Sequence, residues 1–145
     1  MLLLTHRLQV RFRDCDPLGH VNNAVYMTYL EQARFTLWQA QLGFLAKSAA
    51  ETGPRGLGFI LARAECDFRA QARYGDWLDV QVSLGDFGRT SFTYTYEIKH
   101  AETHALVASA RTVLVWFDYD AQTPAPLDEA TKAKLREPVT SFYRP

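Results

Sequence analysis

The residues best suited to chemistry gather in one short segment, which reads DCDPLGHVNN over residues 14–23. This segment holds two carboxylates, a thiol, an imidazole and two amides. A carboxylate can activate water or attack a carbonyl carbon, and preorganised N–H donors can stabilise the oxygen that becomes negative. An oxyanion donor of this kind typically lowers the barrier by about 3–4 kcal/mol. The residue types therefore indicate a candidate site for acyl transfer.

A tight turn is expected directly after the second carboxylate. Residues 16–19 read DPLG, with Asp first, Pro second and Gly fourth, as type I turns prefer. Before this turn, Leu8, Val10 and Phe12 alternate with polar residues and predict a half-buried strand. Since proline also biases the preceding residue toward an extended backbone, Asp16 is expected at the corner where this strand ends.

A long helix is predicted over residues 24–42. Its apolar stripe recurs at spacings of three and four residues: Tyr26, Leu30, Ala33, Leu37 and Ala40. Asn22 or Asn23 can cap its start, and Gly43 can end it. The first backbone N–H groups of a helix have no partner inside it and form a positive end that suits an oxyanion. The candidate carboxylate thus faces a helix N-terminus, with His20 between them in sequence.

The same residues also have ordinary structural explanations. Asn at a helix start is commonly only a cap, Asp before Pro is commonly turn chemistry, and a single His is commonly a surface residue. Cys15 and His20 could instead form a nucleophilic dyad. A calcium loop is excluded, because Leu18 and Val25 stand where oxygen ligands would be required.

The rest of the chain shows a period of two. Four further strands are predicted, over residues 60–69, 78–84, 92–98 and 105–117. Short connections among the last strands imply an antiparallel sheet, one face of which the long helix must cover. The end of the last strand is apolar on both faces, as in a central strand or one at a subunit interface. Residues 43–58 are expected to be mostly loop, and a short helix is expected to start near Asp128 and end before Pro138.

The composition fits one domain spanning residues 1–145, with 48% hydrophobic and 22% charged residues. Lys plus Arg and Asp plus Glu are both 16, which argues against nucleic acid as the main partner. Cys15 and Cys66 belong to no CxxC pair and are interpreted as free thiols in a reducing compartment. No stretch approaches the ~20 apolar residues of a membrane span, so a cytoplasmic location without membrane association is expected.

The segment DCDPLGHVNNAVYMTYLEQAR resembles the hotdog-fold acyl-CoA thioesterases of the 4-hydroxybenzoyl-CoA thioesterase-like family. YGDWLDVQV, GRTSFTYTYEI and ALVASARTVLVWFD resemble the last three strands of that family, so the resemblance covers roughly residues 5–118. It implies an α+β hotdog fold, in which a curved five-stranded antiparallel sheet wraps a long central helix. It also implies a homodimer or homotetramer with active sites between subunits.

The resemblance also implies roles for individual residues. The family's catalytic carboxylate matches Asp16, and the backbone amide that polarises the thioester carbonyl matches Asn23. The His of HVNN, which contributes to catalysis in the related acyl-ACP thioesterases, maps onto His20, although those enzymes carry Asn where this chain has Leu18. Asn22 is implied to help shape the site.

Substrate binding is expected from other segments. Gly88, Arg89 and Thr90 of GRTS lie where family members approach the nucleotide part of coenzyme A. Arg suits bidentate phosphate binding, but an exposed hairpin Arg is an equally simple explanation. Tyr26 is a candidate for the acyl pocket and also belongs to the apolar stripe of the helix.

The leading hypothesis is hydrolysis of an acyl-CoA thioester to a free carboxylic acid and coenzyme A, without a metal or a redox cofactor. One alternative is a hotdog-fold hydratase or dehydratase that acts on acyl thioesters. Another is a non-catalytic module that binds acyl-CoA. The acyl group and the choice between nucleophile and general base for Asp16 stay open.

Overall fold

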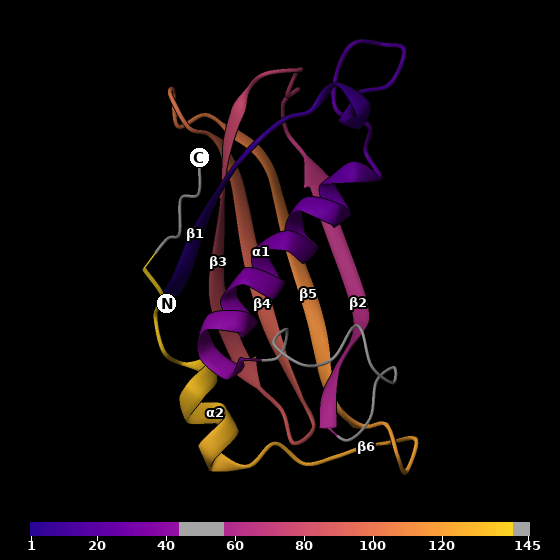
Figure 1. The fold of residues 1–145 in the computed structure, drawn as a ribbon, viewed down its shortest axis with the longest axis vertical. Coiled ribbons are helices and arrows are strands. Elements are labelled where there is room, and N and C mark those ends of the chain that lie inside the picture. Colours follow the sequence, from indigo (N-terminus) through magenta and orange to yellow (C-terminus); the bar gives the residue numbers. More distant parts are fainter. Residues whose placement is uncertain (44–56, 141–145) are drawn as a thin grey trace.

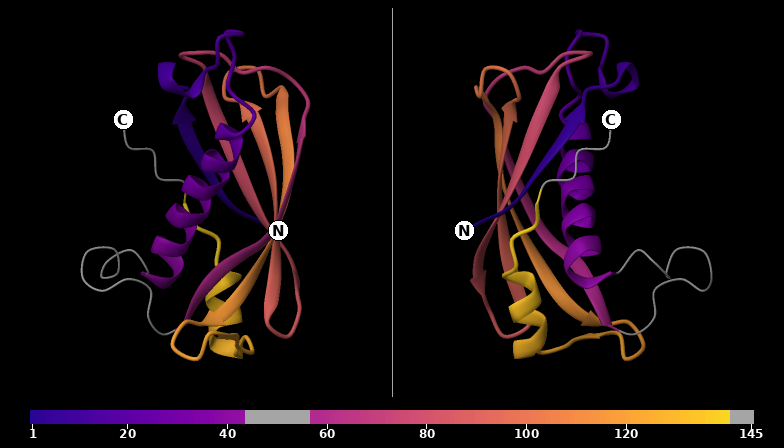
Figure 2. Two further views of the ribbon diagram at one scale, coloured as in Figure 1. Left: turned by 90° about the vertical axis from the view of Figure 1, so that its right-hand side faces the viewer. Right: turned by 60° about the vertical axis from the view of Figure 1, so that its left-hand side comes forward.

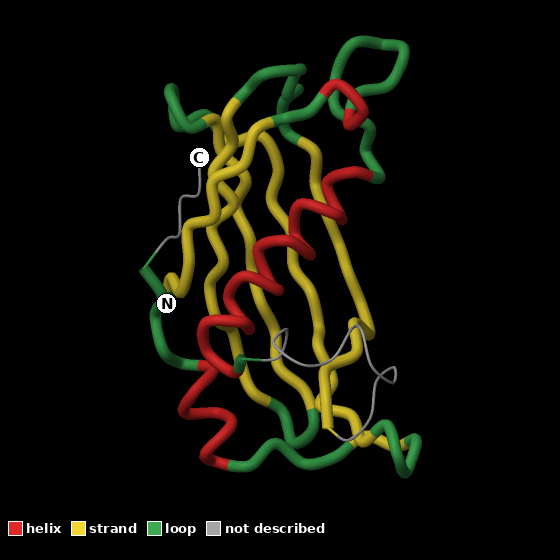
Figure 3. Tube along the Cα trace, viewed as in Figure 1, coloured by secondary structure: helices red, strands yellow, loops and turns green. Residues whose placement is uncertain are grey.

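The structure is a computed structural model, and it describes residues 1–43 and 57–140 (Figures 1 and 3). Within these ranges the chain forms one antiparallel sheet, one long helix and one short helix. The elements are β1 (Leu2–Gln9), the 3₁₀ turn η1 (Phe12–Asp14), α1 (Val25–Leu42), β2 (Leu57–Phe68), β3 (Trp77–Phe87), β4 (Ser91–His100), β5 (Leu106–Asp118), β6 (Thr123–Pro124) and α2 (Glu129–Leu135).

The sheet has the strand order β1-β3-β4-β5-β2, and every pair is antiparallel. Helix α1 lies along one face of the twisted sheet, and α2 lies at one end of the molecule (Figure 2). This arrangement confirms the predicted α+β hotdog fold. The five expected strands are present, and the structure adds β6, a two-residue strand that pairs with the end of β5 and was not predicted.

The core lies between α1 and the sheet. Alternate residues of β4 point at the helix and are fully buried, as their period of two predicted: Phe92, Tyr94, Tyr96 and Ile98. Burying a large apolar side chain of this kind stabilises the fold by roughly 1.5–3 kcal/mol. The helix stripe is confirmed from Tyr26 to Leu37. It is wrong at Ala40, which is exposed, because the buried row continues four residues after Leu37 at Gln41.

The first strand ends earlier than predicted. β1 stops at Gln9, and the Phe12 side chain is 80% exposed on the 3₁₀ turn, so the predicted half-buried strand through Phe12 was wrong. The physical reason is Asp14, whose carboxylate accepts a hydrogen bond from the Arg11 N–H at 2.9 Å. This local bond closes a turn, and the ring of Phe12 packs edge-on against Tyr74 at the surface.

The predicted C-terminal end of α1 and the predicted start of α2 are confirmed. Gly43 ends α1 with a φ of +68°, a left-handed conformation that favours glycine. Asp128 caps α2 by accepting the Thr131 N–H at 2.6 Å. The loop predicted over residues 43–58 lies largely outside the described residues, and β2 already begins at Leu57. In the part of the chain that the structure describes, no helix combines the length and apolar character needed to cross a membrane.

Strand β2 is an edge of the sheet. The predicted alternation holds for Cys66 and Phe68 but is wrong at Ile60, because Phe59 and not Ile60 packs against the core. Several apolar residues of β2 remain open to solvent in the single chain, with Leu61 45% and Phe68 46% exposed. Its pairing with β5 shifts register between Leu61 and Arg63, which is a β-bulge. β5 pairs with β4 and β2 on its two sides, which confirms the central position expected from its apolar end.

Candidate active site

The loop of residues 15–21 is closed on itself. Its ends pair through a β-bridge between Cys15 and Val21, and the Asp16 N–H donates to the His20 carbonyl oxygen at 3.0 Å. The Gly19 N–H donates to the Asp16 carbonyl oxygen at 3.0 Å, which confirms the predicted turn. Gly19 has a φ of +88°, so a side chain at this position would be strained. The loop therefore presents Asp16 at a defined corner.

The Asp16 carboxylate is half-buried and only partly engaged. Its Oδ1 accepts the Leu18 N–H at 2.9 Å, which holds the side chain against its own turn. The other oxygen accepts no hydrogen bond from the described residues. Nearby, the Nδ1 of His20 lies 3.3 Å from the Val21 carbonyl oxygen. Asp16 is thus oriented by one bond and retains an oxygen that can act on a water or a carbonyl group.

The start of α1 offers an unpaired donor. Asn22 takes up two of the first N–H groups, because its Oδ1 accepts from Ala24 and its carbonyl oxygen accepts from Val25, both at 2.9 Å. Ala24 is the residue at the N-cap position, and it makes no side-chain cap bond, so neither Asn is the N-cap. The Asn23 N–H donates to no acceptor among the described residues. This free N–H has the character that an oxyanion donor requires.

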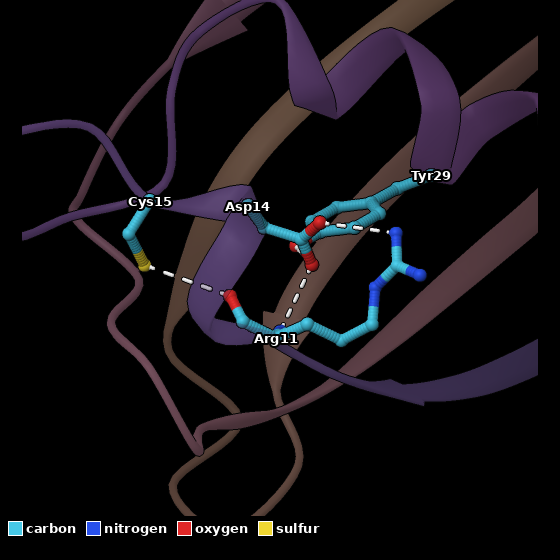
Figure 4. A network of polar contacts seen from close by, with 4 residues as sticks. All are labelled: Arg11, Asp14, Cys15 and Tyr29. Atoms are coloured by element: carbon cyan, nitrogen blue, oxygen red, sulfur yellow. Dashed lines mark hydrogen bonds and ion pairs between the residues drawn. The ribbon is translucent and has the colours of Figure 1, made fainter.

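Asp14, to which the sequence assigned no role, is the anchor of this region (Figure 4). Its side chain is almost fully buried, and it accepts hydrogen bonds from the Tyr29 hydroxyl at 2.8 Å and from the Arg11 N–H at 2.9 Å. Burial alone would raise the pKa of the Asp14 carboxyl, but the bonds from Arg11 and Tyr29 outweigh burial and hold this pKa below its usual range. Asp14 is therefore ionised, and both of its carboxylate oxygens already accept hydrogen bonds, whereas Asp16 keeps one oxygen that can act on a substrate.

Tyr29 and Tyr26 tie the helix to this region. Burial and the hydrogen bond to Asp14 raise the pKa of Tyr29, so its hydroxyl remains a donor. Tyr26, the predicted acyl-pocket residue, is buried, with its ring 5.9 Å from that of Tyr29 and 5.3 Å from that of Phe68 on β2. Its place beside the edge strand puts it between the loop and the exposed apolar residues of β2.

The second predicted group, Gly88, Arg89 and Thr90, lies far from the loop within one chain. These residues form the turn between β3 and β4, where the Gly88 N–H donates to the Ser91 carbonyl oxygen at 2.7 Å. The loop adjoins the opposite end of β3, because the Val21 N–H donates to the carbonyl oxygen of Ala72, in the segment that leads into β3, at 2.8 Å. Figure 1 shows the two segments at opposite ends of the sheet. Strand β3, which runs between these ends, has 11 residues and is therefore about 35 Å long.

A buried cation, which sequence reasoning missed, lies between these ends. Arg34 of α1 is only 5% exposed, and its Nη1 lies 3.4 Å from the Tyr96 hydroxyl oxygen, which also bonds the Thr112 hydroxyl at 2.8 Å. No carboxylate among the described residues pairs with this guanidinium. A cation four residues after Leu30 on the apolar stripe was the signal that could have identified it.

A long helix packed against an antiparallel sheet, with a carboxylate-bearing loop at the helix start, is the architecture of the hotdog fold. Residues 10–135 match the family described as the Thioesterase-like superfamily, so the chain belongs to this family.

Similar proteins that are named as thioester hydrolases or thioesterases agree with this class. The acyl-CoA thioester hydrolase YbgC of Escherichia coli O6:H1 is 25% identical over 134 residues, which cover 90% of this chain and 93% of YbgC. The long-chain acyl-CoA thioesterase FadM of Escherichia coli K12 is 25% identical over 133 residues, which cover 92% of this chain and 97% of FadM. A thioesterase from Thermus thermophilus, solved in complex with coenzyme A and Zn, is 36% identical, covers 91% of each chain and has a TM-score of 0.76. These relatives support thioester hydrolysis and favour neither a hydratase nor a non-catalytic module.

Proposed function

We propose that this protein hydrolyses an acyl-CoA thioester to a free carboxylic acid and coenzyme A. One juxtaposition carries the proposal. Among the described residues, Asp16 keeps a carboxylate oxygen without a hydrogen bond, and Asn23, just beyond the other end of the same closed loop, keeps an N–H without one. Thioester hydrolysis needs these two groups, a base or nucleophile and an oxyanion donor.

In the proposed reaction, the Asn23 N–H donates to the carbonyl oxygen of the thioester and stabilises the negative charge that develops there. Asp16 either takes a proton from an attacking water or attacks the carbonyl carbon itself, forming an anhydride that water then hydrolyses. In both routes the C–S bond breaks, and coenzyme A leaves as a thiolate that takes up a proton. His20 and Asn22 are proposed to shape the site or to assist this proton transfer. Neither route calls for a metal or a redox cofactor.

We propose that each site is shared by two copies of the chain. Among the described residues, no strand pairs with the second edge of β2, and β2 carries exposed apolar side chains. Both are features of a strand that pairs with another copy. Its first half lies with the 88–90 turn, because Ile60 and Ser91 both pair with Val115. Its last residue, Phe68, contacts Tyr26 near the loop.

Antiparallel pairing of β2 with its copy would therefore bring the 88–90 turn of one subunit toward the 15–21 loop of its partner. Arg89 is proposed to contact a phosphate of coenzyme A there, with Gly88 and Thr90 beside it. Two further cations, Lys132 and Arg136, lie 5.7 and 4.9 Å from the centroid of the Phe87 ring next to this turn. Analytical ultracentrifugation should give the mass of a homodimer or homotetramer, and a fully active monomer would contradict the shared site.

We also propose a cytoplasmic location. Cys15 and Cys66 are both free thiols in the structure, as a reducing compartment favours. Cell fractionation with an antibody against the chain tests this location, and recovery outside the cytoplasm would contradict it.

The decisive experiment on function is Asp16→Asn with a panel of acyl-CoA substrates that includes aryl thioesters. Thiol release should fall by roughly three orders of magnitude or more, on the order expected when a catalytic base or nucleophile is removed. The melting temperature should stay near that of the wild type, because the amide oxygen can still accept the Leu18 N–H.

Asp118→Asn is the matched control. Asp118 also accepts backbone N–H groups in a local turn, from Asp120 at 2.9 Å and from Ala121 at 3.0 Å. The Asp118→Asn variant should therefore keep wild-type turnover. Unchanged turnover in Asp16→Asn would contradict the proposed role of this carboxylate.

A further inference from the structure

We propose that Asp14 is a positioning residue, which locks the 15–21 loop to α1 through Tyr29 and thereby aligns Asp16 with the Asn23 N–H. This inference rests on the proposed function and deepens it, because it assigns the second carboxylate of the DCD segment. Asp14 itself does not touch the substrate, since the residue is only 3% exposed.

Asp14 joins three parts of the chain at the base of the loop. Its carbonyl oxygen accepts the Asn22 N–H at 3.0 Å, which fixes the chain as it leaves the loop. Its carboxylate accepts the Arg11 N–H at 2.9 Å, which fixes the chain as it arrives from β1. The same carboxylate accepts the hydroxyl of Tyr29, in the second turn of α1, at 2.8 Å. The segment before the loop, the segment after it and α1 are thus all bonded to one residue.

The chemistry of this junction requires a carboxylate. The Arg11 N–H, the Arg11 Nη2 at 3.2 Å and the Tyr29 hydroxyl are all donors, and they converge on two oxygens. An ionised carboxylate is acceptor-only, and its hydrogen bonds are stronger than those of a neutral acceptor. An amide at this position would direct N–H groups at one of these donors. The hydroxyl of Tyr29 is likewise the only donor that α1 contributes to this cluster among the described residues.

Loosening the junction should affect the chemical step more than binding. Catalysis depends on the alignment of Asp16 with the reacting carbonyl, and a misplacement of about 1 Å can cost as much as 10²-fold in rate. The proposed nucleotide contacts lie at the 88–90 turn, which the partner subunit contributes to the shared site, and among the described residues Asp14 makes no hydrogen bond to that turn. A defect confined to the junction therefore predicts a lower kcat with little change in KM.

The test compares Tyr29→Phe with Tyr94→Phe. Both variants remove one buried hydroxyl, since Tyr29 donates to Asp14 at 2.8 Å and Tyr94 accepts the Trp38 indole N–H at 2.9 Å. Both should lower the melting temperature. Only Tyr29→Phe should lower kcat, by about tenfold with KM within about twofold of wild type. Equal kcat values for the two variants, or a loss in Tyr29→Phe that lies wholly in KM, would overturn the inference.

Hydrogen exchange supplies a second readout that does not depend on turnover. The N–H groups of Asp16 and Asn22, which bond His20 and Asp14, should exchange faster in Tyr29→Phe than in Tyr94→Phe. If the wild type hydrolyses no acyl-CoA, the proposed function fails, and exchange alone then decides whether Tyr29 holds the loop. Equal exchange rates in the two variants would show that Tyr29 does not hold the loop. If the wild type is active and Tyr29→Phe keeps its kcat, the inference is overturned while the proposed function stands.

Discussion

The two ends of this sheet are built differently. At the end that carries the 15–21 loop, short hydrogen bonds within the chain hold Asp14, Asp16 and Asn22 in place. At the end that carries the 88–90 turn, Arg89 is exposed and Lys132 and Arg136 lie over an aromatic ring beside it. The first end is fixed by internal hydrogen bonds and suits bond making and breaking, and the second carries cationic side chains and suits the binding of phosphates. The comparison predicts that damage to the first end lowers kcat and damage to the second raises KM.

The largest effect is expected where the loop meets the helix. Asn23→Pro removes the backbone N–H that we assign to the oxyanion, and it should lower kcat by about 10²–10³-fold. Asn23→Ala keeps this N–H and should retain nearly full activity. Steady-state kinetics on both variants, with circular dichroism to confirm the helix, make the comparison. Equal activity of the two variants would remove the backbone N–H from the mechanism.

The next effect concerns stability and pH at the same end. Asp14→Asn should lower the free energy of unfolding at pH 7 by about 1–3 kcal/mol, because buried donors lose a charged acceptor. The pKa of Asp14 is lower in the folded than in the unfolded protein, so the ionised carboxylate stabilises the fold above its ordinary pKa of about 3.9. That contribution is lost as the pH falls through the lower, folded value.

Urea unfolding between pH 7 and pH 3 checks this prediction. The difference in the free energy of unfolding between wild type and Asp14→Asn should be largest at neutral pH and should decrease in acid. A difference that grows as the pH falls would have the wrong sign for an ionised Asp14.

At the other end, Arg89→Ala should raise KM for acyl-CoA by about five- to tenfold and leave kcat unchanged, since one phosphate contact is removed. A short thioester without the nucleotide, such as an acyl N-acetylcysteamine, should be hydrolysed equally by wild type and variant. Arg111→Ala, which removes an exposed ion pair with Glu65 at 3.4 Å, is the control. A lower kcat of Arg89→Ala on the short thioester would contradict the proposal that the 88–90 turn serves only in binding.

The smallest effect is expected between the ends. Arg34→Met should leave the free energy of unfolding within about 1 kcal/mol of wild type, because a buried cation without a carboxylate partner adds little net stability. Tyr96 keeps its bond to Thr112 in this variant. Thermal and urea unfolding measure the change, and a loss of several kcal/mol would show that Arg34 has a stronger partner in the assembled protein.

Much of the fold followed from periodicity. The stripe of α1, the left-handed Gly43 and the alternation in β4 are local patterns, and local geometry determines them. The 3₁₀ turn at Phe12 was missed, because the alternation up to Phe12 looks like a strand until Asp14 bonds the Arg11 N–H.

The site was predicted unevenly for a related reason. The 15–21 turn was predicted because its residues are adjacent in sequence. The different roles of Asp14 and Asp16 depend on the hydrogen bond from Tyr29 to Asp14. These two residues are 15 positions apart in the sequence, and no local pattern indicates their contact. The distance between the loop and the 88–90 turn depends on strand order, which sequence patterns alone do not fix.

The bulge in β2 has a consequence for how far self-association can go. A long, flat, regular edge can accept strand after strand and so grow without limit. The register shift between Leu61 and Arg63 twists this edge locally, and the flanking charges of Arg63 and Glu65 penalise mismatched alignments. Edge pairing on this strand should accordingly stop at a closed pair of chains and resist fibre formation.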